Sequence, residues 1–385
     1  MRSADVVVLG AGVMGASVAW HLARRGVKVL VLDRGAGPGS GSTARATGGF
    51  RAQYATHINV RLSLLARARL ESFAEDTGVD PGYAPHGYLW LAGNERELAA
   101  LASARQVQHE AGLPESTAVT CDEIQRLVPA LAGDGIVGGT FCPTDGFLLP
   151  LRILEGYLGA AARMGTEVRW GVEVSGLELA NGRVTAALTV EGRVACGAAV
   201  NALGPWAGGL MAETGFELPV APLRRQVAAT VPTRVLPPET PMTIFVGDGF
   251  HFRVRDGRVL LLWATPGVPG RPFDTRVDPG WLSQVTARAH ARVPVLRSVP
   301  IDPGASWAGL YEMSPDKHAI LGPTPGVPNL YLVNGSSGHG VMHAPALGQL
   351  LAEILCDGHA TTLDTTPLAP ERFAAGRLNA VSELL

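Results

Sequence analysis

The stretch that most restricts the fold of this chain lies near its start, at residues 5–33. An apolar run at residues 6–9 leads directly into a glycine-rich turn with the sequence GAGVMG at residues 10–15. A helical pattern follows, and a second apolar run at residues 27–32 ends in Asp33. This order of strand, glycine turn, helix, strand and acid predicts a βαβ unit that binds an adenine dinucleotide. The alternative is a glycine turn that binds nothing.

Each part of the glycine turn has a physical task. Gly10 allows the tight turn, and Gly12 has no side chain to block the close approach of a pyrophosphate. Gly15 lets the helix pack closely against the strand. The helix N-terminus, which includes Val13 and Met14, offers free N–H groups and the positive end of a dipole to the phosphates.

The acid at the end of the second strand is the expected ribose contact. The Asp33 carboxylate can accept hydrogen bonds from ribose hydroxyls. Because a carboxylate repels a 2′-phosphate, Asp33 followed by Arg34 disfavours NADP. NAD and FAD both remain open from this unit alone.

Three later stretches repeat the pattern of a glycine-rich segment near an expected ligand. The loop at residues 35–49 contains Ser42 and Thr43, which we expect to contact phosphate or a ring system rather than to lie in a flexible linker. A strand ending near residue 202 runs into NALGPWA, which we expect to start another helix at a cofactor-facing edge. The expected contacts on this edge are Ala202, Gly204 and Trp206.

The third stretch lies near the end of the chain. A strand at residues 330–333 runs into the loop GSSGHG at residues 335–340, and a helix is expected from about residue 341 to residue 356. Gly338, His339, Gly340 and Val341 would bring a second helix N-terminus to the cofactor. We expect His343 to lie on the helix surface or at an interface.

Composition excludes several classes of protein. The 385 residues are 46% hydrophobic and 17% charged, which is enough for two domains or one large one. The net charge of −2 gives no support for a nucleic-acid partner. The cysteines show no metal-like spacing, so we expect no metal site, no disulfides and a reducing, cytoplasmic compartment. Only four residues precede Asp5, so no signal peptide is expected, and no apolar run is long enough to span a bilayer.

The strand and helix patterns predict that the chain crosses twice between a nucleotide domain and an inserted sheet domain. The fold class is therefore α/β with an α+β second domain: a Rossmann-type FAD-binding domain with an inserted, mostly antiparallel substrate domain. From residue 218 to residue 309 the pattern indicates strands and loops with many prolines. The expected parts are 1–82, 149–217 and 310–385 for the FAD-binding domain, and 83–148 and 218–309 for the substrate domain.

Two side chains are candidates for substrate contact from their local pattern. Arg51 lies between the glycine loop and an apolar helix expected at residues 58–74, and arginine is the natural bidentate partner of a carboxylate. His251 lies between Phe250 and Phe252 on an expected strand. It either packs there or takes a proton.

Taken together, the segments GSGSTAR, CPTDG, NALGPWA, SWAGLYEMSPDKHAILG and GSSGHGVMHAPALG resemble the D-amino-acid-oxidase-like flavoprotein superfamily. The likeness is greatest to the branch of sarcosine oxidase and β-subunit-type, dye-linked L-proline dehydrogenase, and it covers nearly the whole chain in order. It implies FAD and oxidation of the C–N bond of a small amine or amino acid. It also implies that Val174 meets adenine, that Arg51 holds a substrate carboxylate and that Tyr311 lies near the substrate.

Three departures from the resemblance bear on the chemistry. Gly309 stands where a cysteine attaches covalently to flavin in monomeric sarcosine oxidases, so we expect non-covalent FAD. No lysine occurs in the strand at residues 259–263, where those oxidases carry one that helps oxygen take electrons. This favours a dehydrogenase over an oxidase. Met342 replaces a lysine that helps to hold the carboxylate, which puts sarcosine itself in doubt.

The expected reaction is transfer of a hydride equivalent from the substrate α-carbon to flavin N5, with an L-proline-like or sarcosine-like substrate. Tyr311, Phe252 and Met342 are expected to line the pocket, and either His251 or His339 would take a proton unless the amine binds already neutral. The alternatives are a glycine or D-amino-acid oxidase that uses oxygen, an NAD-dependent enzyme, and a flavin-binding subunit without catalysis of its own. A homo-oligomer and an electron-accepting partner subunit both remain open.

Overall fold

The chain builds two eight-stranded sheets in a computed structural model, which describes residues 3–211, 214–265 and 271–381. The first sheet grows from the glycine-turn unit. Its central path runs in the order β17 (Ile320–Thr324), β18 (Val327–Asn334), β11 (Gly192–Asn201), β1 (Ser3–Leu9), β2 (Val29–Asp33) and β8 (Glu167–Trp170). From β18 to β8 neighbouring strands are parallel. A parallel sheet is covered on both faces, which explains the unbroken apolar runs of β1 and β2.

An antiparallel hairpin extends this sheet. Strands β9 (Val174–Ala180) and β10 (Arg183–Thr189) pair with each other, and β10 pairs with β11. The turn between them contains Asn181 and Gly182, both with positive φ, as the Asn-Gly pair predicts.

Four long helices pack together beside the first sheet, and α1 and α8 contact its strands directly. They are α1 (Val13–Ala23), α2 (His57–Glu71), α6 (Pro150–Arg163) and α8 (Gly340–Asp357). Helix α1 packs against both α6 and α8, and α2 packs against α8. The helix expected at residues 58–74 ends earlier, and a short α3 (Phe73–Thr77) follows after Ser72.

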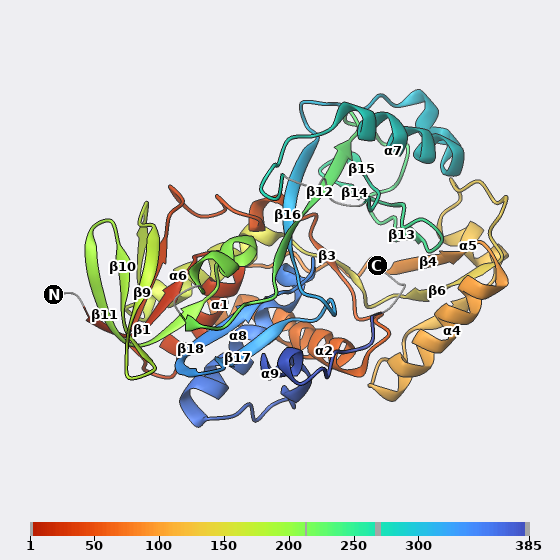
Figure 1. Ribbon diagram of the computed structural model, residues 1–385. Coiled ribbons are helices and arrows are strands. Elements are labelled where there is room, and N and C mark those ends of the chain that lie inside the picture. Colours follow the sequence, from red (N-terminus) through yellow and green to blue (C-terminus); the bar gives the residue numbers. More distant parts are fainter. Residues whose placement is uncertain (1–2, 212–213, 266–270, 382–385) are drawn as a thin grey trace.

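The second sheet carries strands from distant parts of the chain. Its order is β16 (Trp307–Met313), β12 (Ala221–Ala229), β15 (Arg258–Leu262), β14 (His251–Arg255), β13 (Met242–Phe245), β4 (Tyr88–Ala92), β6 (Gly138–Cys142) and β5 (Thr117–Val119). The β13–β4 pair is parallel, and the other neighbouring pairs are antiparallel. Helices α4 (Glu95–Glu110) and α5 (Cys121–Leu127) lie at one end of this lobe in Figure 1.

A helix also occurs where strands and loops were expected. Helix α7 (Pro279–Arg292) begins after Asp278, whose side chain accepts a hydrogen bond from the Gly280 N–H. Its buried side chains, among them Trp281 and Val285, join the apolar core of the second sheet. The prolines of this region favoured a prediction of loops. Pro279, however, is the first residue of the helix, a position where proline is well tolerated.

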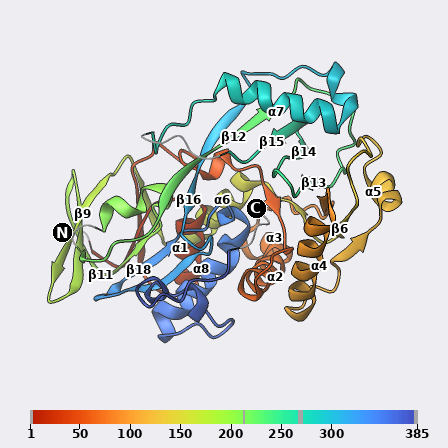
Figure 2. The ribbon, with the colours of Figure 1, turned by 45° about the vertical axis from the view of Figure 1, so that its right-hand side comes forward.

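The two sheets form two lobes joined by long strands. Figures 1 and 2 both show β12 and β16 passing between the lobes, and β16 continues to Met313, past the domain boundary expected after residue 309. The domain ranges themselves stay a prediction. The remaining short elements are β3 (Gly49–Phe50), β7 (Gly146–Phe147), η1 (Thr43–Arg45), η2 (Gly204–Leu210), η4 (Pro294–Ser298), η5 (Thr366–Leu368) and α9 (Glu371–Ala374).

One helix expectation is only partly correct. The segment after β11 forms the 3₁₀ helix η2 rather than an α-helix. Pro205 lacks an N–H group, and the pair Gly208-Gly209 weakens helix propagation, so the tighter and shorter helix results. None of the helices in the described parts of the chain has the length and apolar character needed to cross a membrane.

Candidate active site

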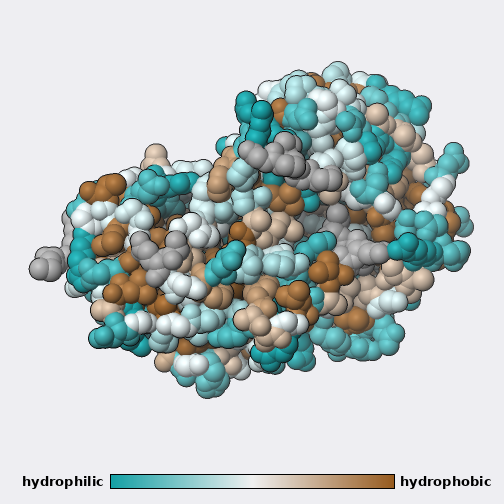
Figure 3. Space-filling view, in the orientation of Figure 1, coloured by the Kyte–Doolittle hydropathy of each residue, from teal (hydrophilic) through white to brown (hydrophobic). Residues whose placement is uncertain are grey.

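A cavity of about 1070 Å³ lies where the two lobes meet, and its wall draws residues from both sheets. The space-filling view shows the surface indented between the lobes (Figure 3). Of the predicted site residues, the following line the cavity: Gly10, Gly12, Val13, Met14, Asp33, Arg34, Ser42, Thr43, Arg51, Val174, Ala202, Gly204, Trp206, His251, Tyr311, Gly338, His339, Gly340, Val341 and Met342. Gly15 is absent from the lining residues.

The glycine turn at one end of the cavity requires glycine at two positions. Gly10 has a φ of 100°, and a Cβ there would lie 2.5 Å from the backbone oxygen of Ala202. A Cβ on Gly15 would lie 1.9 Å from the Gly10 oxygen. Gly15 therefore keeps α1 close to the turn, as expected, while Gly10 and Gly12 form the cavity wall.

The predicted ribose acid is held in place by backbone donors. The N–H of Ala11 donates to Asp33 Oδ2 at 2.7 Å, and the N–H of Gly35 donates to Asp33 Oδ1 at 2.6 Å. Each carboxylate oxygen keeps further acceptor capacity, because it has more than one lone-pair direction. The turn thus presents a fixed carboxylate at the cavity wall.

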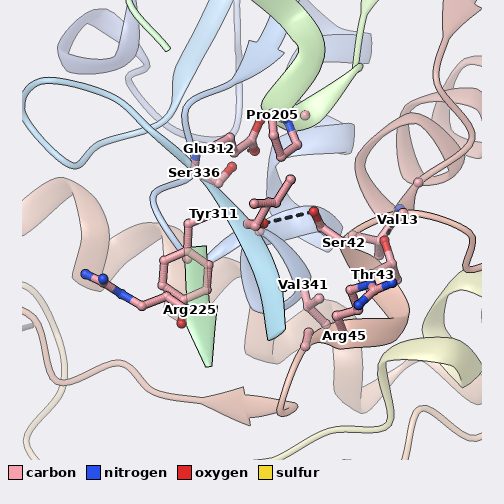
Figure 4. A pocket seen from close by; sticks show the side chains of 18 of the residues that line it. Val13, Ser42, Thr43, Arg45, Pro205, Arg225, Tyr311, Glu312, Ser336 and Val341 are labelled. Carbon is pink, nitrogen blue, oxygen red and sulfur yellow. Dashed lines mark hydrogen bonds between the residues drawn. The ribbon is translucent and has the colours of Figure 1, made fainter. Parts of the chain in front are cut away.

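The hydroxyl groups of the first glycine loop have protein partners. The Ser42 hydroxyl donates to the Leu310 carbonyl oxygen at 2.9 Å, as Figure 4 shows, and the Val13 N–H donates to Thr43 Oγ1 at 3.1 Å. Both side chains line the cavity, but they also fasten the loop to β16 and to the start of α1. Their first effect is to position the loop.

An arginine–tryptophan pair lies on the cavity wall together with a residue of β9. The guanidinium carbon of Arg34 lies 4.6 Å from the ring centre of Trp206, an arrangement typical of a cation–π contact. Val174 lines the same cavity. The three residues bring an apolar and aromatic wall to the region where the resemblance places adenine.

The second glycine loop lies directly against Tyr311. Gly338 has a φ of 92°, and a Cβ there would lie 2.4 Å from the Tyr311 ring. Helix α8 then starts at Gly340, and its first residues face the cavity without a side-chain cap. Its free N–H groups and the positive end of its dipole can therefore stabilise negative charge in the cavity.

Arg51 is buried, with 6% of its surface exposed. Its guanidinium carbon lies 4.4 Å from the ring centre of Tyr54 and 5.0 Å from that of Trp90. An Arg51 N–H group lies 3.2 Å from His339 Nε2. Because a guanidinium only donates, His339 Nε2 accepts and must carry a lone pair. Burial lowers the pKa of His339 well below 6.5, and the charge of Arg51 adds to this effect.

The other candidate histidines lie in different surroundings. His251 lines the cavity, its Nδ1 lies 2.8 Å from the Gly249 oxygen, and burial lowers its pKa to about 4. His343 is not a surface residue as expected: it is 2% exposed and its Nε2 lies 2.8 Å from Ser63 Oγ, because the packing of α8 on α2 encloses it.

Phe252 was expected to line the pocket and does not. Neighbouring residues on a strand point to opposite faces, so when His251 faces the cavity, Phe252 faces the core. Phe252 is fully buried there, beside Phe250.

The polar residues on the wall that the sequence did not single out include Arg225, Glu312 and Lys317. Glu312 follows Tyr311 on β16, and its Oε1 accepts a hydrogen bond from the Ser336 N–H at 3.3 Å. Its buried Oε2 has no hydrogen-bond partner among the residues that the structure describes. Burial raises the pKa of Glu312 to about 7. Lys317 could have been noticed, because Lys28 and Lys317 are the only lysines in the chain.

The residues present fit an extended dinucleotide. The glycine turn leaves backbone exposed at the wall, and a buried hydroxyl, Ser336 Oγ, and the Glu312 oxygen remain without partners in the cavity wall. Buried polar atoms normally have a partner, so their presence indicates a polar ligand. The volume matches that of large ligand pockets, on the order of 1,000 Å³.

Comparison with known proteins places the chain among flavoproteins. Residues 5–354 match the family model described as "FAD dependent oxidoreductase" (DAO). Glycine oxidase of Geobacillus kaustophilus is 30% identical over 376 residues, covering 96% of this chain and 97% of the relative. The bovine (Bos taurus) FAD-dependent oxidoreductase domain-containing protein 1 is 27% identical, covering 97% and 85%. Among solved structures, L-proline dehydrogenase from P. horikoshii has a TM-score of 0.90 and 27% identity, covering 98% of this chain and 100% of the other.

Proposed function

Since the chain belongs to the DAO family of FAD-dependent oxidoreductases, we propose that it oxidises the C–N bond of a small amino acid or secondary amine, of L-proline or sarcosine type. One observation carries this proposal. The cavity joins the glycine turn at one end to the buried Arg51 at the other, and the second glycine loop and Tyr311 lie on the same wall. A carboxylate held by Arg51 would bring the rest of a small substrate beside them.

The residues that would hold FAD lie at the end of the cavity formed by the glycine turn. Gly10, Gly12 and the start of α1 would take the pyrophosphate, and Asp33 the ribose. When bound, FAD supplies the acceptor for a hydride equivalent from the substrate carbon. The start of α8, at Gly340 and Val341, would stabilise the negative charge that collects beside it.

The protein's own part in the reaction is orientation and proton placement. Arg51 can donate two parallel hydrogen bonds to a carboxylate, which fixes the direction of the amine-bearing carbon. His339 holds the guanidinium through Nε2 and stays neutral. His251, whose pKa is lowered to about 4, is neutral at pH 7. So low a pKa makes it a weak proton acceptor, which favours an amine that binds already neutral.

We propose an acceptor other than oxygen, supported by the lack of lysine at residues 259–263 and by the likeness to L-proline dehydrogenase. The second candidate is an oxygen-using oxidase. Two observations favour it: the 30% identity to glycine oxidase, and Lys317, which brings a positive charge to the cavity from a different element. Bleaching of the flavin by L-proline, sarcosine, glycine and D-amino acids, first without and then with oxygen, distinguishes them. Full turnover with oxygen and release of peroxide would contradict the proposal that the acceptor is not oxygen.

Replacement of Arg51 tests the orientation of the carboxylate. Arg51→Ala should weaken binding of the reducing substrate by about 10- to 100-fold, because a hydrogen bond to a charged group is lost. Binding is measured from the change in flavin absorbance on anaerobic titration. The control is Arg61→Ala on the exposed face of α2, which should bind as the wild type does. Unchanged affinity in Arg51→Ala would show that another group holds the carboxylate.

A further inference from the structure

Two cations on the cavity wall have no carboxylate partner among the residues that the structure describes: Arg225 and Lys317. Arg225 lies on β12, opposite Gly309 of β16. Its Nη1 donates to the Thr265 carbonyl oxygen at 2.6 Å, and its guanidinium carbon lies 5.8 Å from the ring centre of Tyr311. The side chain thus reaches the wall held by one neutral acceptor and one aromatic ring.

These cations add to the charge of Arg51. Burial lowers the pKa of Lys317 from its usual value, and the charges of Arg225 and Arg51 lower it further, so both arginines lie close enough to act on Lys317. Burial also lowers the pKa of Arg225. Removing unpaired charges from water is unfavourable, and an anion bound between them would offset that cost.

The acidic groups on this part of the wall do not neutralise these charges. Asp248 is engaged by Arg288 at 3.2 Å and by Arg292 at 2.8 Å. Glu312 has a pKa raised by burial to about 7, so it carries at most part of a negative charge at neutral pH. The histidine on this wall, His251, is neutral and adds no positive charge.

Arg225 lies away from the first glycine loop. In Figure 4 its side chain extends past Tyr311 on the side away from Ser42, Thr43 and Arg45. The charges of Arg225 and Arg51 both act on His251 and on Lys317, so Arg225 lies toward the part of the cavity that contains Arg51. A single carboxylate on Arg51 would leave Arg225 and Lys317 uncompensated there.

We propose that the substrate carries a second carboxylate, bound by Arg225 with the charge of Lys317 beside it. The ligand class is a dicarboxylic amino acid or secondary amine, with the other carboxylate on Arg51. Arginine suits this task because its planar guanidinium can donate two parallel hydrogen bonds to a carboxylate. The inference rests on the proposed function and specifies its substrate class.

Two non-reacting acids test the second carboxylate site without turnover. Succinate and butyrate have the same number of carbons and differ in one carboxylate. Titrated into the FAD-loaded protein and followed by the shift in flavin absorbance, succinate should bind about 10-fold more tightly or better. Arg225→Gln should remove this preference and change butyrate affinity by less than about 2-fold, because butyrate has no group for Arg225.

The matched control is Arg224→Gln. Arg224 is the next residue on β12, does not line the cavity and lies 3.7 Å from Asp274 in an ion pair. The Arg224→Gln variant should keep the wild-type preference for succinate over butyrate. Flavin content and melting temperature of each variant show that it is folded and loaded. Equal binding of succinate and butyrate by the wild type, or equal weakening of both by Arg225→Gln, overturns the inference.

A reaction assay separates failure of this inference from failure of the proposed function. N-methylalanine and N-methylaspartate, each as both enantiomers, differ by one carboxylate and are added without oxygen. Faster flavin bleaching at low concentration by the aspartate derivative, lost in Arg225→Gln, supports the inference. Equal bleaching by both overturns it. If no amine or amino acid bleaches the flavin, the proposed function fails, and the succinate and butyrate titrations still decide whether Arg225 binds a second carboxylate.

Discussion

The carboxyl group of Glu312 connects the cavity to the pH dependence of stability. One oxygen accepts a hydrogen bond from the Ser336 N–H, while the other is buried and has no hydrogen-bond partner in the described parts of the chain. Burial raises its pKa from 4.5 to about 7, so the folded protein keeps a proton that the unfolded chain releases. Its contribution to stability is therefore fully present below about pH 4.5 and is lost as the pH rises to about 7.

We predict that Glu312→Gln removes this pH dependence. The amide keeps the acceptor for Ser336 and places an uncharged NH₂ group where the unpartnered oxygen lies. Relative to the wild type, the variant should gain on the order of 1–3 kcal/mol between pH 5 and pH 8. Melting temperatures across this range measure it, with Glu155→Gln on the exposed face of α6 as the control. If Glu312→Gln kept the wild-type dependence of melting temperature on pH, that dependence would come from other groups.

Close approach of α1 and α8 depends on one glycine. A Cβ on Gly348 would lie 2.1 Å from Ser17 Oγ, and that hydroxyl donates to the Ala344 oxygen at 2.7 Å. The two helices carry the glycine turn and the α8 start, which both face the cavity. A side chain at this contact would push both of them apart.

The same substitution in two helices separates packing from helix propensity. Gly348→Ala should destabilise the protein by about 1–3 kcal/mol through overpacking and should lower its flavin content. Gly159→Ala on α6, where the nearest atom is 3.6 Å away, should instead stabilise it by about 0.5–1 kcal/mol. Urea unfolding and the ratio of flavin to protein measure both. Equal effects of the two substitutions would mean that the helices separate without cost.

Bound FAD should stabilise both lobes together, because the cavity wall draws on both sheets. Added at about 100 times its Kd, FAD should raise the free energy of unfolding by about 2.7 kcal/mol. Calorimetry with and without FAD measures this, and NAD serves as the control. Gly309 has no side chain through which a flavin could be attached, which supports non-covalent binding of FAD. Denaturation should therefore release the yellow colour, and colour retained by the denatured chain would contradict the prediction.

Much of the fold was predictable because local patterns carry it. The turn at residues 10–15 and the loop at residues 335–340 are short, and their glycines have one physical reason each. Helix α7 was missed because its prolines read as loop residues. Arg225 and Lys317 were missed because their significance depends on which strands meet: β12 pairs with β16 only in the folded sheet. Arg225 belongs to none of the quoted motifs. Lys317 lies in the segment SWAGLYEMSPDKHAILG and is one of two lysines, but nothing in that segment shows that its side chain faces the cavity.

Three hydrogen bonds fasten the first glycine loop to β16. The Ser42 hydroxyl donates to the Leu310 oxygen, Arg45 Nη1 donates to the Ala308 oxygen, and Trp307 Nε1 donates to the Arg45 oxygen. The loop of one lobe is thus fixed to the edge strand of the other. The lobes cannot swing apart as independent bodies without breaking these bonds, so exchange of the large cofactor is expected to be slow, while a small substrate enters and leaves without such a rearrangement. We therefore expect the protein to keep one bound dinucleotide through many substrate encounters.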